Sequence, residues 1–204
     1  MVEVRTNLMS NTMYLMIAWV SSIFLNFFFQ LIATKTLLPE ELGILATAIN
    51  FAAIIAALLT LGMEQTTQRL TAYYLGKDKN EYLKSVLWFF LLATVSLNIL
   101  TVTVLLIFSS EISQLTKLPR NILFFSIAAL MPLSISIFLA GVIRGYQNMR
   151  YLLATSILGD FIKLLVSATL VFFLGLKVFG FLIGYLMAVS SVLIFRFSSI
   201  RLFI

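Results

Sequence analysis

The amino-acid sequence predicts an all-α fold, a polytopic membrane bundle of six transmembrane helices forming one unit over residues 1–204. Composition is the first observation behind this prediction. Hydrophobic residues make up 61% of the chain and charged residues 11%, whereas about 25% are charged in an average soluble domain. The second observation is that five uncharged stretches reach the roughly 18 residues that a helix needs to cross a bilayer. A sixth crossing between Arg150 and Lys177 is needed to connect the fourth stretch to the fifth.

Each predicted span is an apolar stretch bounded by charged residues or turn signals. The first is longer than the core of a signal peptide and no small-residue cleavage site follows it, so we expect a retained helix. The second begins at Pro39, which suits a first helical turn, and Glu40 and Glu41 complement the positive end of the helix dipole. The predicted spans cover residues 13–34, 42–63, 85–108, 121–143, 152–175 and 178–199.

The later spans and one loop carry further signals. The loop of residues 64–85 is long enough for a short amphipathic helix at the membrane surface, with Leu70, Tyr73, Tyr74 and Leu75 turned to lipid and the basic residues toward the headgroups. The third span has only Asn98 at depth, and the fourth contains Pro132. In the sixth span Gly180 and Gly184 are four residues apart, which permits close approach of a neighbouring helix.

The residue types that are missing argue against an enzyme. The chain has neither cysteine nor histidine, which removes thiolate nucleophiles, imidazole bases and the best ligands for soft metals. We therefore expect no cofactor, no metal and no catalytic residue. The net charge of +6 would suggest nucleic acid in a soluble protein, but here the basic residues flank apolar spans, so we expect no nucleic-acid partner.

The distribution of basic residues predicts the orientation. With a cytoplasmic N-terminus, nine lysines and arginines fall on the inner side and four on the outer side. This is the bias expected from the positive-inside rule, and loop solvation alone would not produce it. The sequence therefore predicts a multi-pass protein of the cell membrane with both termini in the cytoplasm.

A polar stripe runs along the first span. Ser22, Asn26 and Gln30 are spaced four residues apart, so they lie on one face of a helix. Such a face must contact protein or water, because hydrocarbon offers no hydrogen-bond partner. The stripe serves either hydrogen bonding between helices or the lining of a hydrated cavity. Asn50, deep in the second span, is a further candidate for the cavity.

The fifth span contains two opposite charges, Asp160 and Lys163. Asp160 lies ten residues beyond Arg150, about 15 Å of helix, and therefore near the middle of a roughly 30 Å hydrocarbon core. Alone, each charge would cost about 2.5–3.5 kcal/mol there, but a spacing of three residues lets them pair. Two interpretations remain: a structural clamp to another helix, or a pair facing a central aqueous cavity that attracts an anion and binds a proton or cation.

Several short strings occur in a characteristic order. They are "PEELG" at 39–43, "LG" at 61–62, Arg69, "YLGKD" at 74–78 and "GVIRG" at 141–145. In this order and spacing they resemble polysaccharide flippases of the multidrug/oligosaccharidyl-lipid/polysaccharide exporter (MATE-like) superfamily, where a basic residue in the place of Lys163 is also familiar. The resemblance covers about residues 10 to 200.

The resemblance implies one lobe of a MATE-like transporter fold, which rocks against a second lobe to move a lipid-linked oligosaccharide between leaflets of the membrane. Lys163 would neutralise the phosphate of the lipid headgroup, and Arg69 and Arg144 would do so at the cytoplasmic entrance, although both arginines also fit as topology anchors. Family members usually have about twice as many spans. We therefore expect either a fragment, or a half-size chain that assembles with a second six-helix lobe from a separate chain or a second copy.

Other functions stay open at this point. A drug/cation antiporter of the same superfamily would use Asp160 for the coupling ion. A membrane-embedded transferase would need clustered acidic or histidine residues, and the acidic residues here are scattered. The length is also compatible with a non-transporting membrane subunit or a gene fragment.

Overall fold

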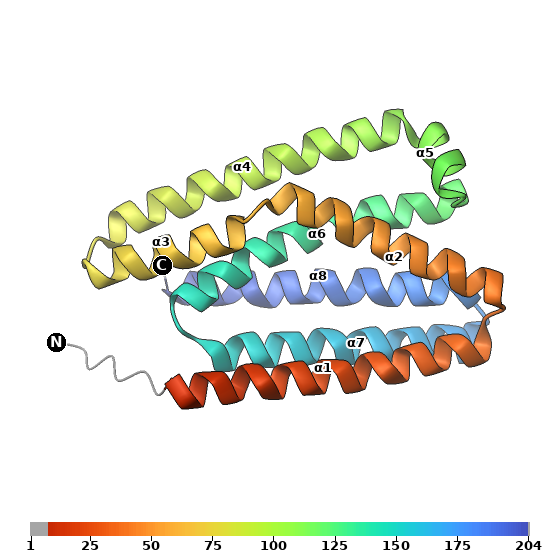
Figure 1. Cartoon of the computed structure of the whole chain (residues 1–204), viewed down its shortest axis with the longest axis horizontal. Helices are drawn as coiled ribbons and strands as arrows, with labels where there is room; N and C mark the ends of the chain where they lie inside the picture. Colours follow the sequence, from red (N-terminus) through yellow and green to blue (C-terminus); the bar gives the residue numbers. More distant parts are fainter. Residues whose placement is uncertain (1–7, 204) are drawn as a thin grey trace.

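The computed structural model describes residues 8–203, which form eight α-helices and contain no strand (Figure 1). The helices are α1 (Leu8–Thr36), α2 (Pro39–Thr60), α3 (Met63–Gly76), α4 (Asn80–Ile107), α5 (Ser109–Thr116), α6 (Arg120–Gly145), α7 (Met149–Leu174) and α8 (Lys177–Phe203). Six are long and apolar enough to cross a membrane, and α3 and α5 are the two that are not. The predicted all-α bundle with six membrane-spanning helices is confirmed.

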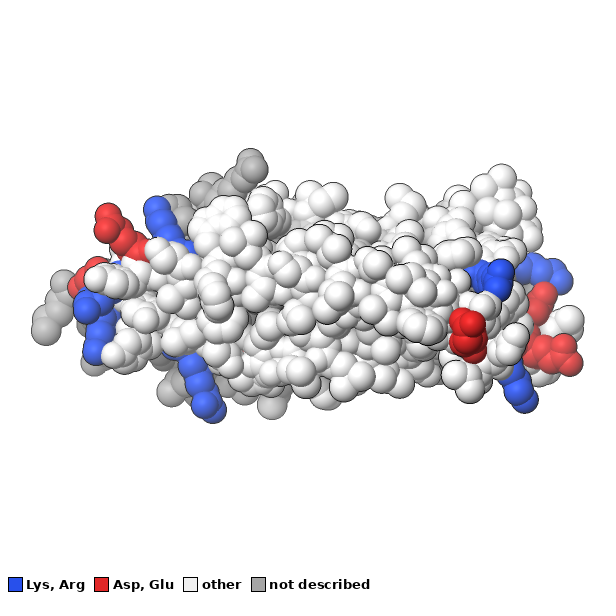
Figure 2. Space-filling model, turned by 90° about the horizontal axis from the view of Figure 1, so that it is seen from above, with Lys and Arg blue, Asp and Glu red and all other residues white. Residues whose placement is uncertain are grey.

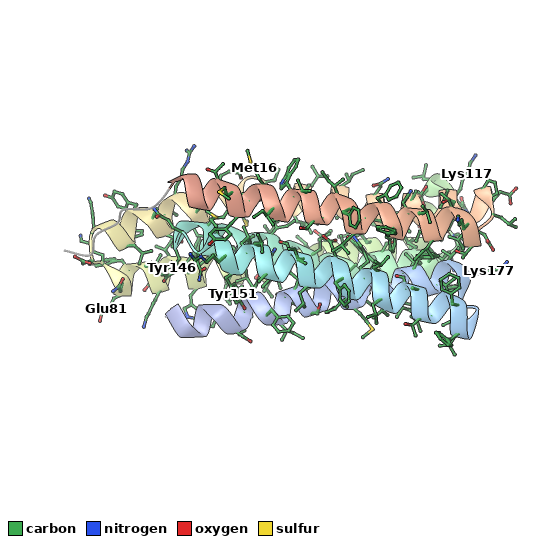
Figure 3. The ribbon with its side chains drawn as sticks, turned by 90° about the horizontal axis from the view of Figure 1, so that it is seen from below. Met16, Glu81, Lys117, Tyr146, Tyr151 and Lys177 are labelled. Carbon is green, nitrogen blue, oxygen red and sulfur yellow. The ribbon has the colours of Figure 1, made fainter. Side chains whose placement is uncertain are left out.

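The bundle is organised around α6. This helix packs against α2, α3, α4 and α8, and it has the largest buried share of the six candidate spans. Helix α7 packs against α8, and α1 lies on the outside of the bundle along α7 (Figures 1 and 3). The side of α7 that faces α1 is therefore near the surface of this chain, while its other side is held by α8.

Charged side chains gather at the two ends of the bundle. In the face shown by Figure 2, lysines, arginines, aspartates and glutamates lie at the ends and leave an uncharged band between them. This is the distribution expected of a multi-pass membrane protein, because hydrocarbon does not solvate charge. We call the end at which α1 begins the α3 end, and the opposite end, which carries Lys117 and Lys177, the α5 end (Figures 1 and 3).

A backbone break separates α2 from α3. Leu61 and Gly62 both have positive φ angles, +27° and +77°, so the chain changes direction within one turn. The expected helix in the following loop is present as α3, but it does not present Tyr74 and Leu75 to lipid. Both pack against an apolar cluster that includes Leu83. Tyr73, by contrast, is 53% exposed. The prediction is wrong for Tyr74 and Leu75, because α3 docks on α6.

Small residues on α6 explain this docking. A Cβ atom on Gly141 would lie 2.4 Å from the carbonyl oxygen of Glu64, and one on Gly145 would lie 2.4 Å from Cβ of Thr71. Helix α3 thus approaches α6 at backbone distance, and the buried Thr67 and Thr71 form its contact face. The GVIRG string therefore lies at the end of α6 as a packing surface, followed by the turn into α7.

Helix bounds differ from the predicted spans mainly where polar residues begin a helix. Helix α4 starts at Asn80 instead of residue 85, and α7 starts at Met149 instead of residue 152. The eight-residue helix α5 was not predicted, because it is much shorter than a membrane-spanning stretch and gives no comparable apolar signal. The expected close approach of a neighbouring helix to the glycines of α8 is confirmed. A Cβ atom on Gly184 would lie 2.1 Å from Ser167 Oγ of α7.

The deep polar residue of α4 is satisfied inside the protein. Asn98 is fully buried, and Ser134 Oγ on α6 donates a hydrogen bond of 2.9 Å to its Oδ1 atom. Its amide nitrogen donates to the carbonyl oxygen of Thr94 at 2.8 Å. Asn98 therefore links α4 to α6 and is not part of the polar surface described below.

The glycine contact between α7 and α8 can be tested with a matched pair of substitutions. In Gly184→Ala the new methyl group would meet backbone atoms of α7 at 2.9 Å and 3.1 Å as well as Ser167, and overpacking of this kind typically costs about 1–3 kcal/mol. In Gly43→Ala it would meet nothing within 4 Å, and alanine is favoured in a helix by up to about 1 kcal/mol.

We expect the melting temperature of the purified protein in detergent to fall for Gly184→Ala and to stay the same or rise for Gly43→Ala. Equal melting temperatures for the two variants would contradict the close contact of α8 with α7.

Candidate functional site

The two charges of α7 meet the polar stripe of α1. Lys163 Nζ lies 3.0 Å from Asp160 Oδ1 and 2.6 Å from Asn26 Oδ1. The amide nitrogen of Asn26 lies 3.4 Å from Asp160 Oδ1 and completes a triangle between the two helices. Asn26 can close it because its side chain both accepts from an ammonium group and donates to a carboxylate. We call these three residues the charge triangle.

The two charged side chains of the charge triangle are mostly buried but partly exposed. The side chain of Lys163 is 11% exposed and that of Asp160 is 19% exposed. The ammonium group also lies 5.2 Å from the centroid of the Phe29 ring, a distance at which the ring face attracts a cation. Each charge is thus stabilised by several partners at a depth where an isolated charge would be unfavourable, and part of the triangle stays accessible.

Three adjacent cavities surround the charge triangle. The inner cavity, of about 290 Å³, lies among α6, α7 and α8 and includes Asp160, Lys163 and Arg196 in its lining. The α3-side cavity, of about 530 Å³, lies along α1 from Leu15 to Asn26. The α2-side cavity, of about 390 Å³, lies among α1, α2 and α7. Each pair of cavities shares lining residues, and we call the three together the groove.

The structure brings the predicted cavity residues into this one groove. Its lining includes Ser22, Asn26, Gln30, Asn50, Asp160 and Lys163. Ser22 lies between the inner and α3-side cavities, while Gln30 and Asn50 line the α2-side cavity opposite each other on α1 and α2. Asn26 serves both interpretations of the stripe, because it hydrogen-bonds to α7 and also lines a cavity.

The two arginines expected at the entrance have different positions. Arg144 lines the α3-side cavity and forms an ion pair with Glu64 of α3. Arg69 is exposed on α3 and lines none of the three cavities of the groove. The place of Arg69 at a cytoplasmic entrance stays a prediction.

Sequence reasoning missed Arg196 as part of the groove. It is one of the nine basic residues counted on the inner side, but its guanidinium turns into the bundle and donates a hydrogen bond of 2.8 Å to the backbone oxygen of Ser136. It also reaches Ser156 Oγ at 3.3 Å and lines both the inner and the α3-side cavities. The available signal was that Arg196 falls inside the predicted span of residues 178–199, a turn before its end.

The stability of the charge triangle can be tested with a double-mutant cycle. Asp160→Leu and Lys163→Met each leave one charge without its partner, which is costly inside a membrane helix bundle, whereas the double variant leaves neither. We expect the two substitutions to be non-additive by about 0.5–3 kcal/mol in the free energy of unfolding, measured in detergent.

A second ion pair supplies the control for this cycle. Lys177 Nζ and Glu41 Oε1 are also 3.0 Å apart, but the side chain of Lys177 is 63% exposed. Water weakens exposed pairs, so the cycle of Lys177→Met and Glu41→Leu should give a coupling below about 1 kcal/mol. Additive effects at Asp160 and Lys163 would show that the two charges do not stabilise each other.

Comparison with known proteins gives one match. A family model described as polysaccharide biosynthesis protein matches residues 8–203, which is nearly the whole chain. No curated protein and no solved structure matches the chain. The match covers the six membrane-spanning helices and all the residues of the groove named above. This multi-pass membrane protein therefore belongs to the polysaccharide biosynthesis protein family, whose members are transporter-like.

Proposed function

We propose that this chain is one lobe of a flippase that translocates a lipid-linked oligosaccharide across the cell membrane by alternating access. The observation that carries the proposal is the charge triangle, which places Lys163 at the junction of the inner and α2-side cavities. Membership of the polysaccharide biosynthesis family supports a role in moving a polysaccharide precursor. The work is transport, with no covalent chemistry and no cofactor.

The chemistry of the groove suits such a cargo. A lipid-linked sugar carries a phosphate next to polar hydroxyl groups, and both must cross a medium that solvates neither. Lys163 offers a cation for the phosphate, and the amides of Asn26, Gln30 and Asn50 offer donors and acceptors for hydroxyl groups. As the phosphate binds Lys163, Asp160 is released from its partner and becomes available to a proton or another cation.

A partner lobe is part of the proposal. The groove borders α1, which packs mainly against α7 and leaves large apolar residues exposed, among them Trp19, Ile23 and Phe27. A polar groove beside an exposed apolar face would be closed by a second six-helix lobe, either a separate chain or a second copy. Transporters of alternating access are commonly built from two such repeats.

The α3 end is the one we assign to the cytoplasm. Lys77, Lys79 and Lys84 lie at or near the turn between α3 and α4, where α1 begins and α8 ends (Figure 1). The positive-inside rule then places both termini in the cytoplasm. Lipid substrates would enter beside α1 and Arg144 at this end.

Translocation should depend on Lys163. Removing the ammonium in Lys163→Ala deletes a charge-assisted contact with the phosphate, worth about 1.5–3 kcal/mol. We therefore expect the translocation rate to fall about 10- to 100-fold in Lys163→Ala and to recover partly in Lys163→Arg. The measurement uses sealed vesicles with the complete assembly and follows how fast a lipid-linked oligosaccharide becomes accessible to a membrane-impermeant sugar-binding probe.

The control for this experiment is Lys84→Ala, which removes the same charge from an exposed position at the α3 end. Its rate should match the unmodified protein. A rate in Lys163→Ala equal to that of Lys84→Ala, at equal protein level, would refute the role assigned to Lys163.

Orientation can be measured by cysteine labelling, because the natural chain contains no cysteine. In intact cells a membrane-impermeant maleimide should label Lys117→Cys, at the α5 end, and should label Lys79→Cys, at the α3 end, only after the cells are opened. The opposite pattern would invert the proposed topology while leaving the fold unchanged.

A further inference from the structure

Arg196 lies in an interior position that the charge triangle does not explain. Its guanidinium is held by the backbone oxygen of Ser136 on α6 and by Thr155 and Ser156 on α7, at 2.8, 3.5 and 3.3 Å. Two neighbouring helices, α6 and α7, therefore position this cation of α8. Such contacts keep the guanidinium pointed toward the cavities and reduce the ordering that binding would otherwise require.

Ser136 supplies a second, independent observation. Its side chain is 3% exposed, it lines the inner cavity together with Arg196, and its hydroxyl has no hydrogen-bond partner among the described residues. A buried hydroxyl without a partner is unfavourable, and most are satisfied by another group or by a ligand. The hydroxyl of Ser136 is thus a donor available beside the guanidinium of Arg196.

The charge around Arg196 favours an anion. The charged residues lining the inner cavity are Arg196, Lys163 and Asp160, so positive charge is in excess. The α3-side cavity is lined by Arg144 and Arg196, and the ion-pair partner of Arg144 is Glu64 of α3. Ser22 and Ser156 line both cavities and connect them beside the guanidinium.

The Arg196 site is separate from the charge triangle. Ser156, which contacts Arg196, lies seven residues before Lys163 on α7, which is about 10 Å along the helix. The groove therefore has two cationic positions in series, the first nearer the α3 end.

We propose that Arg196, with the hydroxyls of Ser136 and Ser156, binds a phosphate group at the α3 end of the groove before that group reaches Lys163. A guanidinium presents a planar fork of donors that matches phosphate oxygens, and hydroxyl donors complete such a site. The proposal rests on the proposed function only for the source of the phosphate, a lipid carrier. Binding at Arg196 does not require that Lys163 carry the cargo.

The test is a binding measurement on the full chain in phosphatidylcholine nanodiscs. The probes are a polyprenyl phosphate, the same polyprenol without phosphate, and inorganic phosphate, each followed by native mass spectrometry. We expect Arg196→Gln to weaken binding of the polyprenyl phosphate about tenfold or more, and Ser136→Ala to weaken it by a smaller factor. Binding of the polyprenol should not change in either variant.

Arg150→Gln is the matched control. Arg150 carries the same charge at the start of α7, but it contacts the ring of Tyr14 and lines none of the cavities of the groove. It should bind polyprenyl phosphate like the unmodified protein. If Arg150→Gln loses binding as much as Arg196→Gln does, general surface charge explains the affinity and the site is refuted.

The remaining outcomes separate the sources of phosphate. Competition by inorganic phosphate that disappears in Arg196→Gln supports the site. Binding of inorganic phosphate at Arg196 with no binding of the polyprenyl phosphate overturns the lipid carrier as its ligand. Unchanged affinity in Ser136→Ala and in Arg196→Gln overturns the proposal. If Arg196→Gln does not fold, the affinity of the conservative variant Ser136→Ala for polyprenyl phosphate tests the site by itself. A negative result in this binding experiment does not affect the translocation result for Lys163, because binding and not transport is measured.

Discussion

The groove depends on the close contact between α7 and α8. Gly184 of α8 lies against α7 so tightly that a Cβ atom there would be 3.1 Å from the carbonyl oxygen of Lys163 itself. Gly159 makes the reciprocal approach, since a Cβ atom there would lie 2.4 Å from Cγ2 of Val192. With one side of α7 held at backbone distance, the side chains of Asp160 and Lys163 point to α1 and the cavities. Small residues on the buried side thus determine where the charges on the other side lie.

That arrangement explains how two charges are tolerated inside the membrane. Asn26 of α1 contacts both, and Phe29 lies near the ammonium. The structural clamp and the cavity lining, which look like alternatives in the sequence, are combined in the same residues. Contacts between α1 and α7 are made partly by polar groups that the proposed cargo would also contact, so the proposal links cargo binding to the packing of α1.

The sequence was sufficient for the fold and for part of the groove. Span-length apolar stretches predict the six long helices because a bilayer requires them, and the spacing of Ser22, Asn26 and Gln30 predicts one polar face because helical geometry is regular. Neither signal states which helices are neighbours. The docking of α3 on α6 and the inward turn of Arg196 both depend on such pairings, so they required the structure. Arg69 and Arg144 both belong to the motif strings, yet Arg144 lines the groove and Arg69 does not, and this difference too depends on the helix pairings.

The charge triangle also has an electrical consequence. One elementary charge that crosses a membrane potential of 100 mV exchanges about 2.3 kcal/mol with the field. Lys163 and Asp160, 3.0 Å apart, form a pair with no net charge. A lobe that reorients with this pair intact therefore does no electrical work through it. In the proposed mechanism, binding of an anionic group gives the loaded lobe a net charge in the groove, so the membrane potential acts on the loaded lobe in a way it does not act on the empty one.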